Sequence, residues 1–516
     1  MINWILVVDF GSQVTQLIAR RIREYNIYCE VIPYNKLKVN LLKTNKPKGI
    51  ILSGGPASVN EVKSPKIPKE YFLKNIPILG ICYGMQLIAK EMGGKVKRIK
   101  SREYGDTKIQ VIKKCPINPS TWKVKSHHRV WMSHGDSISK LPEKFYSFIK
   151  SEDSNYAGIV NEKKKIYGLQ FHPEVFHTKD GNTIIQNFLT KICQCKQTWN
   201  MGTFKDEAIN TLKKTIENNK VLCALSGGVD SSVTALLLHQ AIGSQLLCVF
   251  IDHGLLRKNE KNEVCRFFQS QKNLNFICVD ASKQFLEILR DVIDPEIKRK
   301  LIGNEFIKVF EKEAKKHQNL IFLAQGTLYP DVIESRSPLG GPSTTIKSHH
   351  NVGGLPKKMN LKLIEPLKSL FKDEVRALGK KLNLQKDMLN RHPFPGPGLA
   401  IRVMGKITKD RLNILREADK IYIDLLKEEN LYNKIWQAFC VLLPVKTVGV
   451  MGDSRTYENV CALRAVTSTD GMTADYYPFD HIFLKKISTN IINQVKGINR
   501  VVYDTTSKPP GTIEWE

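Results

Sequence analysis

The feature that most constrains this chain is a short apolar strand that runs directly into a glycine-rich turn and then a helix. Ile76–Leu79 is the predicted strand, residues 80–84 read Gly-Ile-Cys-Tyr-Gly, and Met85–Met92 is the predicted helix, ended by Gly93-Gly94. The glycines permit a tight turn and close approach of neighbouring backbone. A helix N-terminus favours the thiolate form of a cysteine placed there. The segment therefore predicts a nucleophile elbow with Cys82 as the nucleophile.

A second strand, glycine-rich turn and helix follow later in the chain. The strand Val221–Leu225 precedes the turn, and the helix Val233–Gln240 follows it. Small residues let the backbone wrap phosphate oxygens, and the helix N-terminus adds positive potential. No lysine stands in the turn, so it is not the phosphate loop of kinases and GTPases. We predict ATP binding by the whole turn: Ser226, Gly227, Gly228, Val229, Asp230, Ser231 and Ser232.

Both segments belong to stretches of alternating strands and helices, which is typical of α/β domains with parallel sheets. A chain of 516 residues is long enough for about three domains. Three prolines and two glycines within residues 392–398 cannot continue a helix and indicate a boundary. We predict an α/β domain over 1–197, a doubly wound parallel-sheet domain over 198–392 and a smaller α+β domain over 393–516.

Composition excludes several classes of protein. No apolar run approaches the ~20 residues that span a membrane, and the N-terminus lacks the basic region of a signal peptide. The eleven cysteines are scattered along the chain and do not form a disulfide framework. We therefore expect a cytoplasmic protein. The net charge of +29 comes from lysines spread over the whole chain, so we expect no nucleic acid and no membrane among its partners.

A cysteine nucleophile needs a base, a group that orients the base, and donors for the developing oxyanion. His172 and Glu174 stand two residues apart, so they face the same side of an extended segment. We predict His172 as the base and Glu174 as the group that orients it. The backbone N–H groups of Gly55, which follows a strand, and Tyr83 are the predicted oxyanion donors.

These residues, in this order and each at a strand end, resemble class I glutamine amidotransferases over the first 190-odd residues. The resemblance implies a thioester between Cys82 and glutamine, release of ammonia and hydrolysis to glutamate. The Ser-Gly-Gly-x-Asp-Ser-Ser turn resembles the loop of ATP pyrophosphatases, which cleave ATP between the α and β phosphates. It implies that Asp252 and Arg257, near the end of the next strand, hold adenosine. Asp230 is a candidate ligand of Mg²⁺.

Coupling ammonia to an adenylated acceptor within one chain is favoured by proximity. The residues do not name the acceptor, but further motifs resemble the glutamine-hydrolysing GMP synthetase family. They include residues 294–300, 324–327, 346–351 and 392–398, and Lys-Pro-Pro-Gly-Thr-Ile-Glu-Trp-Glu at 508–516. The resemblance implies the substrates glutamine, ATP and XMP, Mg²⁺ as cofactor, and a homodimer formed through the C-terminal domain. It implies XMP contacts at Arg299, Asp453, Lys508 and Glu514.

Lys347, His349 and His350 are open to more than one interpretation. With no carboxylate nearby they are poor metal ligands. Glycine- and proline-rich segments flank them, so we predict a lid that closes over the adenylate, with a plain solvated loop as the alternative.

Rival functions remain at this stage. A tRNA-modifying adenylating enzyme shares the Ser-Gly-Gly-x-Asp-Ser turn and suits a charge of +29, but it needs no cysteine triad. Enzymes that make NAD or asparagine keep the chemistry and change the acceptor. A non-catalytic regulator that kept the fold is disfavoured, because Cys82, His172 and Glu174 are all present.

Overall fold

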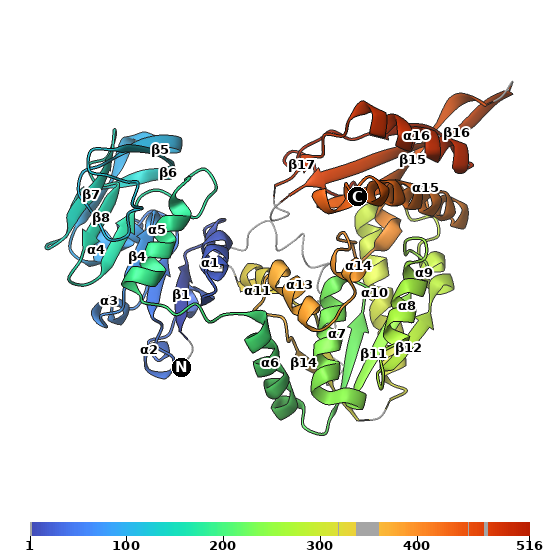
Figure 1. Cartoon of the computed structure of the whole chain (residues 1–516), viewed down its shortest axis with the longest axis horizontal. Helices are drawn as coiled ribbons and strands as arrows, with labels where there is room; N and C mark the ends of the chain where they lie inside the picture. The colour runs from blue at the N-terminus through green and yellow to red at the C-terminus, as the bar shows by residue number, and fades with distance from the viewer. Residues whose placement is uncertain (1–2, 318, 337–360, 452–453, 469–472) are drawn as a thin grey trace. The chain divides into compact units, whose positions relative to one another are not determined.

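The computed structural model describes residues 3–317, 319–336, 361–451, 454–468 and 473–516. The chain divides into two compact units (Figure 1). Of the described residues, the first unit contains 3–204 and 330–336, and the second contains those from 205 to 329 and from 361 to 516. The predicted division into three domains stays a prediction.

The first unit is built on a mixed sheet. Its strands, in spatial order, are β2 (Tyr28–Pro33), β1 (Trp4–Asp9), β3 (Gly49–Leu52), β4 (Ile78–Ile81), β9 (Ile166–Leu169), β8 (Gly158–Asn161), β7 (Tyr146–Ser151), β5 (Lys95–Val111) and β6 (His127–Lys140). From β2 to β9 neighbouring strands are parallel, and from β9 to β6 they are antiparallel. The central strands β1, β3 and β4 are buried along their whole length, as expected when both faces of a parallel sheet are covered.

Helices and helical turns accompany this sheet. They are α1 (Thr15–Glu24), η1 (Tyr34–Lys36), α2 (Leu41–Thr44), α3 (Glu70–Leu73), α4 (Tyr83–Glu91), α5 (Gly181–Asn187) and the π-helical turn η2 (Phe188–Ile192). The predicted amphipathic helix after the first strand is α1, which buries Ile18 and Ile22. Helix α4 packs on β4 and β9, so the segment that carries Cys82 is held against the middle of the sheet.

The second unit contains a parallel sheet of order β12-β11-β10-β13-β14. The strands are β10 (Lys220–Leu225), β11 (Leu246–Asp252), β12 (Asn275–Asp280), β13 (Leu320–Ala324) and β14 (Lys362–Ile364). The chain order reverses at β10, because β11 and β12 lie on one side of it and β13 and β14 on the other. Ligands of doubly wound sheets bind at the carboxyl ends of the strands at such a switch point. The predicted phosphate loop follows β10.

Several helices and short turns connect these strands and precede them. They are α6 (Met201–Ile216, in this unit from Lys205), α7 (Val229–Ile242), η3 (Gly243–Gln245), α8 (Glu260–Gln269), α9 (Ser282–Ile288), α10 (Pro295–Ala314), α13 (Lys372–Lys381) and α14 (Lys386–Leu389). Helix α11 (Tyr329–Arg336) follows β13 in the chain and is assigned to the first unit from Pro330 on. Helix α7 packs against β10, β11 and α13. Asp294 begins α10 by accepting a hydrogen bond from the Ile297 N–H, with proline at the next position.

The C-terminal part of the second unit is α+β. Its elements are η4 (Gly398–Ile401), α15 (Lys409–Glu428), η5 (Tyr432–Lys434), β15 (Gln437–Met451), β16 (Ser454–Thr467), β17 (Asp475–Tyr476), α16 (His481–Gln494) and β18 (Ile498–Tyr503). One core cluster joins Val249 of β11 with Leu415 of α15 and Cys440 of β15, so this part shares its interior with the parallel sheet. None of the described helices combines the length and apolarity needed to cross a membrane.

The predicted fold class, α/β with parallel sheets and an α+β C-terminal part, is confirmed. The bounds of several elements differ from the predicted ones. Strand β4 and helix α4 meet at Cys82 itself, two residues away from the predicted bounds on either side. Helix α7 begins at Val229 and not at Val233, so residues 229–232 of the phosphate loop form its first turn.

Candidate active sites

Cys82 stands between β4 and α4 in a conformation that few residues adopt. Its φ is 50° and its ψ is −105°, a strained combination for a residue with a side chain. The Cys82 N–H donates to Leu169 O at 2.7 Å, and the Gly84 N–H donates to Ser53 O at 3.1 Å. A Cβ on Gly84 would lie 2.7 Å from Leu52 Cβ, so only glycine allows the turn to approach β3 this closely. The predicted elbow is therefore present at Cys82.

His172 and Glu174 are in contact as predicted from their spacing. His172 Nδ1 lies 2.8 Å from Glu174 Oε1, and both side chains are buried. Burial by itself lowers the pKa of His172, but the Glu174 carboxylate and a hydrogen bond to Cys82 outweigh it. The pKa of His172 is therefore well above its usual value. Thr178 Oγ1 donates to His172 O at 2.7 Å and fixes the backbone of the base.

The turn after β3 lies against both Cys82 and His172. A Cβ built on Gly54 would be 3.1 Å from His172 Cε1 and 3.8 Å from Cys82 Cβ. The N–H groups of Ser53 and Gly84 are bound to the carbonyls of Val8 and Ser53, so they are not oxyanion donors. The predicted donors, Gly55 and Tyr83, are not excluded in this way, and the N–H of Gly54 is a further candidate in the turn.

Two further groups contact the thiol. The Gln170 side-chain amide donates to Cys82 Sγ at 3.8 Å, and the Cys82 thiol donates to Ser133 O at 3.5 Å. Gln170 stands in the Gln-Phe-His-Pro-Glu motif, but the motif alone did not single it out. An amide donor that faces the sulfur stabilises a thiolate.

The phosphate loop is held in shape by its own side chains. Ser226 Oγ and Ser231 Oγ are 3.1 Å apart, and the hydroxyls of Ser231 and Ser232 donate to Gly228 O at 3.1 and 2.8 Å. Gly227 has a φ of +77°, which favours glycine. The loop is therefore a preformed turn at the N-terminus of α7, where anions bind favourably.

Asp230 is paired with a lysine that local sequence patterns do not reveal. Lys372 Nζ, at the start of α13, lies 2.6 and 2.5 Å from the two Asp230 carboxylate oxygens. A second cation, Arg391, donates to Gly227 O at 3.2 Å. Both stand more than a hundred residues after the loop, so only the fold brings them to it. Both cations are paired with carboxylates, Lys372 with Asp230 and Arg391 with Glu260 and Glu263.

Asp252 and Arg257, both predicted to hold adenosine, differ in where their side chains lie. Asp252 is at the carboxyl end of β11, where its Oδ1 accepts from the Gly254 N–H and its Oδ2 pairs with Lys261 Nζ at 2.8 Å. Arg257 is turned into the protein, where its Nε is 3.2 Å from Asp419 Oδ2 and its Nη2 donates to Ala438 O at 3.0 Å. Arg257 therefore joins the parallel sheet to the C-terminal part of the unit.

Three of the predicted XMP residues, Arg299, Lys508 and Glu514, lie in the second unit. Arg299 donates to the main-chain oxygen of Glu516. Glu514 accepts from Arg402 Nε and Nη2 at 3.0 and 2.7 Å, and from Gln437 Nε2 at 2.6 Å. The backbone of Lys508 pairs with Ala474. Asp453 and the predicted lid residues Lys347, His349 and His350 lie outside the described residues.

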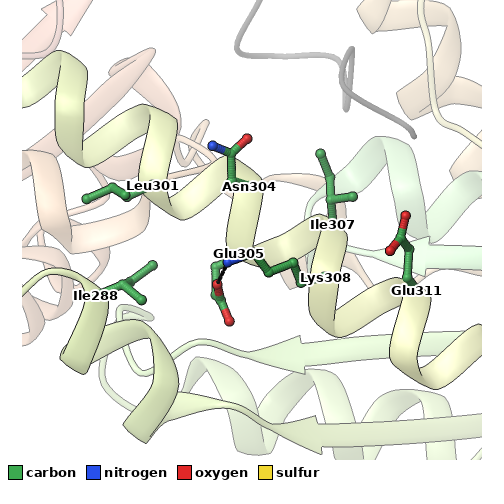
Figure 2. A pocket seen from close by; sticks show the side chains of 7 residues that line it. All are labelled: Ile288, Leu301, Asn304, Glu305, Ile307, Lys308 and Glu311. Carbon is green, nitrogen blue, oxygen red and sulfur yellow. Dashed lines mark hydrogen bonds and ion pairs between the residues drawn. The ribbon is translucent and has the colours of Figure 1, made fainter. Parts of the chain in front are cut away.

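A surface cavity of about 340 Å³ lies beside α10, lined by Ile288, Leu301, Asn304, Glu305, Ile307, Lys308 and Glu311 (Figure 2). None of the residues predicted for catalysis or nucleotide binding lines it. The cavity is therefore separate from both candidate sites.

An elbow cysteine with a histidine–glutamate pair on one sheet, and a phosphate loop at the switch point of another, define a glutamine amidotransferase joined to a nucleotide-activating domain. Known family models agree with this class. A model of class-I glutamine amidotransferases matches residues 6–192, and a model of the GMP synthase C-terminal domain matches residues 424–515. The HUP domain of tRNA methyl transferases matches residues 219–310, the stretch that contains the phosphate loop.

Curated relatives resemble the chain over nearly its whole length. "GMP synthase [glutamine-hydrolyzing]" of Sinorhizobium fredii is 56% identical over 99% of this chain and 98% of its own. The proteins of the same name from Nitrobacter hamburgensis and Bradyrhizobium diazoefficiens are 57% and 58% identical, over 99% of this chain and 96% and 93% of their own. The chain therefore belongs to the glutamine-hydrolysing GMP synthase family. The predicted family and enzyme class, a ligase that takes nitrogen from glutamine, are confirmed, and the tRNA-modifying alternative is not supported.

Proposed function

We propose that the protein hydrolyses glutamine at Cys82, adenylates XMP with ATP at the second unit, and transfers the ammonia to make GMP. Its products are GMP, glutamate, AMP and pyrophosphate. The observation that carries the first half is the contact between His172 and Glu174 beside an elbow cysteine. The acceptor rests on membership of the family whose curated relatives are named GMP synthases.

At the first site the roles follow from the contacts. The Cys82 thiol gives its proton to His172, the sulfur attacks the amide carbon of glutamine, and the N–H groups of Gly55 and Tyr83 stabilise the oxyanion. Because the pKa of His172 is raised, the imidazole is a ready proton donor to the departing amide nitrogen. Ammonia leaves and a thioester remains. Water, deprotonated by His172, then cleaves the thioester to glutamate, while Glu174 keeps the ring in place.

At the second site the loop 226–232 and Lys372 hold the phosphates of ATP, and Asp252 lies at the adjacent strand end. The XMP oxygen at C2 attacks the α-phosphorus and pyrophosphate leaves. Ammonia then adds at C2 and AMP leaves. The N–H groups at the start of α7 and the Lys372 ammonium stabilise the charge on the departing pyrophosphate.

Asp230 fits a Mg²⁺ ion that arrives with ATP. Mg²⁺ is commonly held by one or two carboxylates, with substrate phosphates and water completing its six ligands. Among the described residues no cluster of three or more acidic, histidine or cysteine side chains could hold a metal by itself, and Asp230 offers one carboxylate beside Lys372. The ion would neutralise phosphate charge. Its site would therefore form only together with the nucleotide.

Arg299, Lys508 and Glu514 are proposed to bind XMP, with Asp453. The cations suit its phosphate, and Glu514 suits a purine N–H. A carboxylate has about four acceptor positions. Arg402 and Gln437 use three of those on Glu514. One position therefore remains for a substrate N–H. Lys347, His349 and His350 are proposed to close over the adenylate.

We also propose a homodimer formed through the β15–β16 hairpin. Val448 and Tyr457 are directly opposite in register, so their side chains share a face with Val450, two residues along. These three side chains are 52%, 60% and 73% exposed. An exposed apolar face of this kind is typical of an interface. Val450→Lys should lower the mass measured by sedimentation, and an unchanged mass would argue against this face.

A cytoplasmic location is proposed from the thiols. No disulfide joins the cysteines that the structure describes, and Cys82 must stay reduced to act as a nucleophile.

The test is to incubate the protein with glutamine, ATP, Mg²⁺ and XMP, and to measure GMP, AMP and glutamate. Cys82→Ala should abolish synthesis from glutamine and leave synthesis from ammonium salts intact. Equal loss of both would contradict the assignment of separate sites. Deamido-NAD or aspartate in place of XMP tests the rival acceptors, and amination of either at a comparable rate would contradict the proposal.

A further inference from the structure

A fully buried lysine lies where α10, η4 and the C-terminal segment 508–516 meet. The Lys298 side chain has no exposed surface. Its Nζ donates to Ala400 O at 3.2 Å, to Val403 O at 3.1 Å and to Glu516 Oε2 at 2.5 Å. An ammonium group has three donors, and these three acceptors satisfy all of them. The Glu516 carboxylate supplies the only negative charge among the three.

Glu516 is held from the opposite side as well. Its Oε1 accepts from the Gly405 N–H at 3.4 Å, and its main-chain oxygen accepts from Arg299. Its side chain is 5% exposed. The carboxylate therefore joins three segments of the chain that are far apart in sequence.

Glu514, two residues earlier, is fixed by the same stretch of chain that faces Lys298. Arg402, which lies between Ala400 and Val403, binds the Glu514 carboxylate through two hydrogen bonds. Trp515 points elsewhere and donates to Asp504 Oδ2 at 2.9 Å. Alternate residues of the segment are thus anchored in different places, and Glu514 and Glu516 both bind to the stretch 402–405, through Arg402 and the Gly405 N–H.

We propose that Lys298 and Glu516 are positioning residues for XMP: their buried ion pair holds segment 508–516 at the distance from α10 at which Lys508, Glu514 and Arg299 can bind one nucleotide. This inference rests on the proposed function of those three residues. Arg299 is the neighbour of Lys298 on α10, and Glu514 is two residues from Glu516, so the ion pair sets the separation of the two groups of contacts. A buried ion pair of this kind is a weak source of stability but fixes register.

The test uses the full chain with ammonium salt as nitrogen donor, so that glutamine hydrolysis does not limit the rate. Glu516→Gln keeps the shape and removes the charge. We expect the KM for XMP to rise about 10- to 100-fold, because a substrate-binding group displaced by about 1 Å costs that much. We expect kcat, the KM for ATP and glutamine hydrolysis to stay nearly unchanged.

Lys298→Met and the double variant Lys298→Met/Glu516→Gln complete a double-mutant cycle with Glu516→Gln and the wild type. Lys298→Met leaves a buried carboxylate without its cation, whereas the double variant leaves no lone charge. The double variant should therefore have a KM for XMP above that of the wild type. The increase should be smaller than the product of the increases in the two single variants. The matched control is Lys406→Met/Asp291→Asn, which removes a pair of similar length, 2.6 Å, whose side chains are 57% and 67% exposed. It should leave the KM for XMP unchanged.

The outcomes separate this inference from the proposed function. An unchanged KM for XMP in Glu516→Gln, or a fall in kcat alone, overturns the inference. If Glu516→Gln does not fold, the double variant Lys298→Met/Glu516→Gln is the test. A wild-type KM for XMP in that double variant also overturns the inference. Lys508→Ala tests the proposed function by itself. If Lys508→Ala raises the KM for XMP and the Lys298 and Glu516 variants do not, the binding proposal stands and the positioning proposal fails.

Discussion

The charged side chains beside Cys82 and those at the phosphate loop after β10 differ in their burial and in how permanent their pairing is. Beside Cys82, the polar partners are already in contact, with His172 bound to Glu174 in a buried site. At the loop, Asp230 and Lys372 are bound to each other, although each is proposed to serve a substrate. Their side chains are 30% and 42% exposed. The first site is therefore built for one fixed geometry, and the second for exchange of partners.

The difference follows from solvent exposure. A partly exposed ion pair contributes about 1 kcal/mol or less, so other charged groups can replace either partner at little cost. A buried charge that loses its partner costs several kcal/mol, so the His172–Glu174 pair has to persist through the reaction. The two regions therefore differ in which substitutions affect activity and which affect folding.

The largest effect is expected at Lys372. Lys372→Met removes the charge that faces the phosphates and frees Asp230, and we expect the rate of ATP-dependent synthesis to fall on the order of 10²–10³-fold. Glutamine hydrolysis in the absence of the other substrates should be unchanged. Pyrophosphate release measures the ATP-dependent synthesis, and glutamate production measures glutamine hydrolysis. Lys380→Met, later in α13, is the control. A wild-type rate of ATP-dependent synthesis in Lys372→Met would show that the Lys372–Asp230 pair has no part in ATP use.

A smaller effect is expected from alanine at one glycine of each of the two turns. A Cβ on Gly84 would meet the Leu52 backbone, whereas a Cβ on Gly228 would meet only Ser226 Oγ at 3.3 Å. Gly84→Ala should therefore lower the free energy of unfolding by about 1–3 kcal/mol, as overpacking does. Gly228→Ala should leave stability unchanged and raise the KM for ATP, because the methyl group stands where phosphate binds. Urea unfolding and steady-state kinetics separate these results, and equal destabilisation by both would contradict the comparison.

The first region could be predicted from sequence almost completely, because its signals are local. The Gly-x-Cys-x-Gly turn predicts the sharp bend at Cys82, and the spacing of His172 and Glu174 predicts their contact, both without knowledge of the fold. The predicted bounds of β4 and α4 were wrong by two residues, since the sharp turn is compressed into Cys82. Gln170 was missed because its contact with the sulfur depends on how β9 lies beside β4.

The second region shows the limit of sequence reasoning. The loop itself was found, but Lys372 is 142 residues from Asp230, and Arg402 is 112 residues from Glu514. No periodicity or motif connects such pairs, because only the packing of α13 and η4 brings them together. The orientation of Arg257 likewise depends on Asp419, which belongs to a helix formed much later in the chain.

The smallest expected effect concerns pH and the His172–Glu174 pair. The pKa of His172 in the folded protein is above the ordinary value of about 6.5 that it has when unfolded. The stability that protonated His172 gives to the folded protein is therefore fully present below about pH 6.5, and it is lost as the pH rises through the raised pKa. Glu174→Gln removes the main cause of this increase. The melting temperature should thus fall by a few degrees at pH 6 and by less at pH 9.

Scanning calorimetry at both pH values measures this difference. Glu24→Gln, which alters the exposed pairs with Arg20 and Arg21, is the control and should show no such trend. His172→Gln combined with Glu174→Gln should remove the trend as well, because no imidazole remains to titrate. If Glu174→Gln lowers the melting temperature equally at both pH values, the pair stabilises the fold by packing and not by charge. The contrast drawn with the exposed Asp230–Lys372 pair would then have to rest on geometry alone.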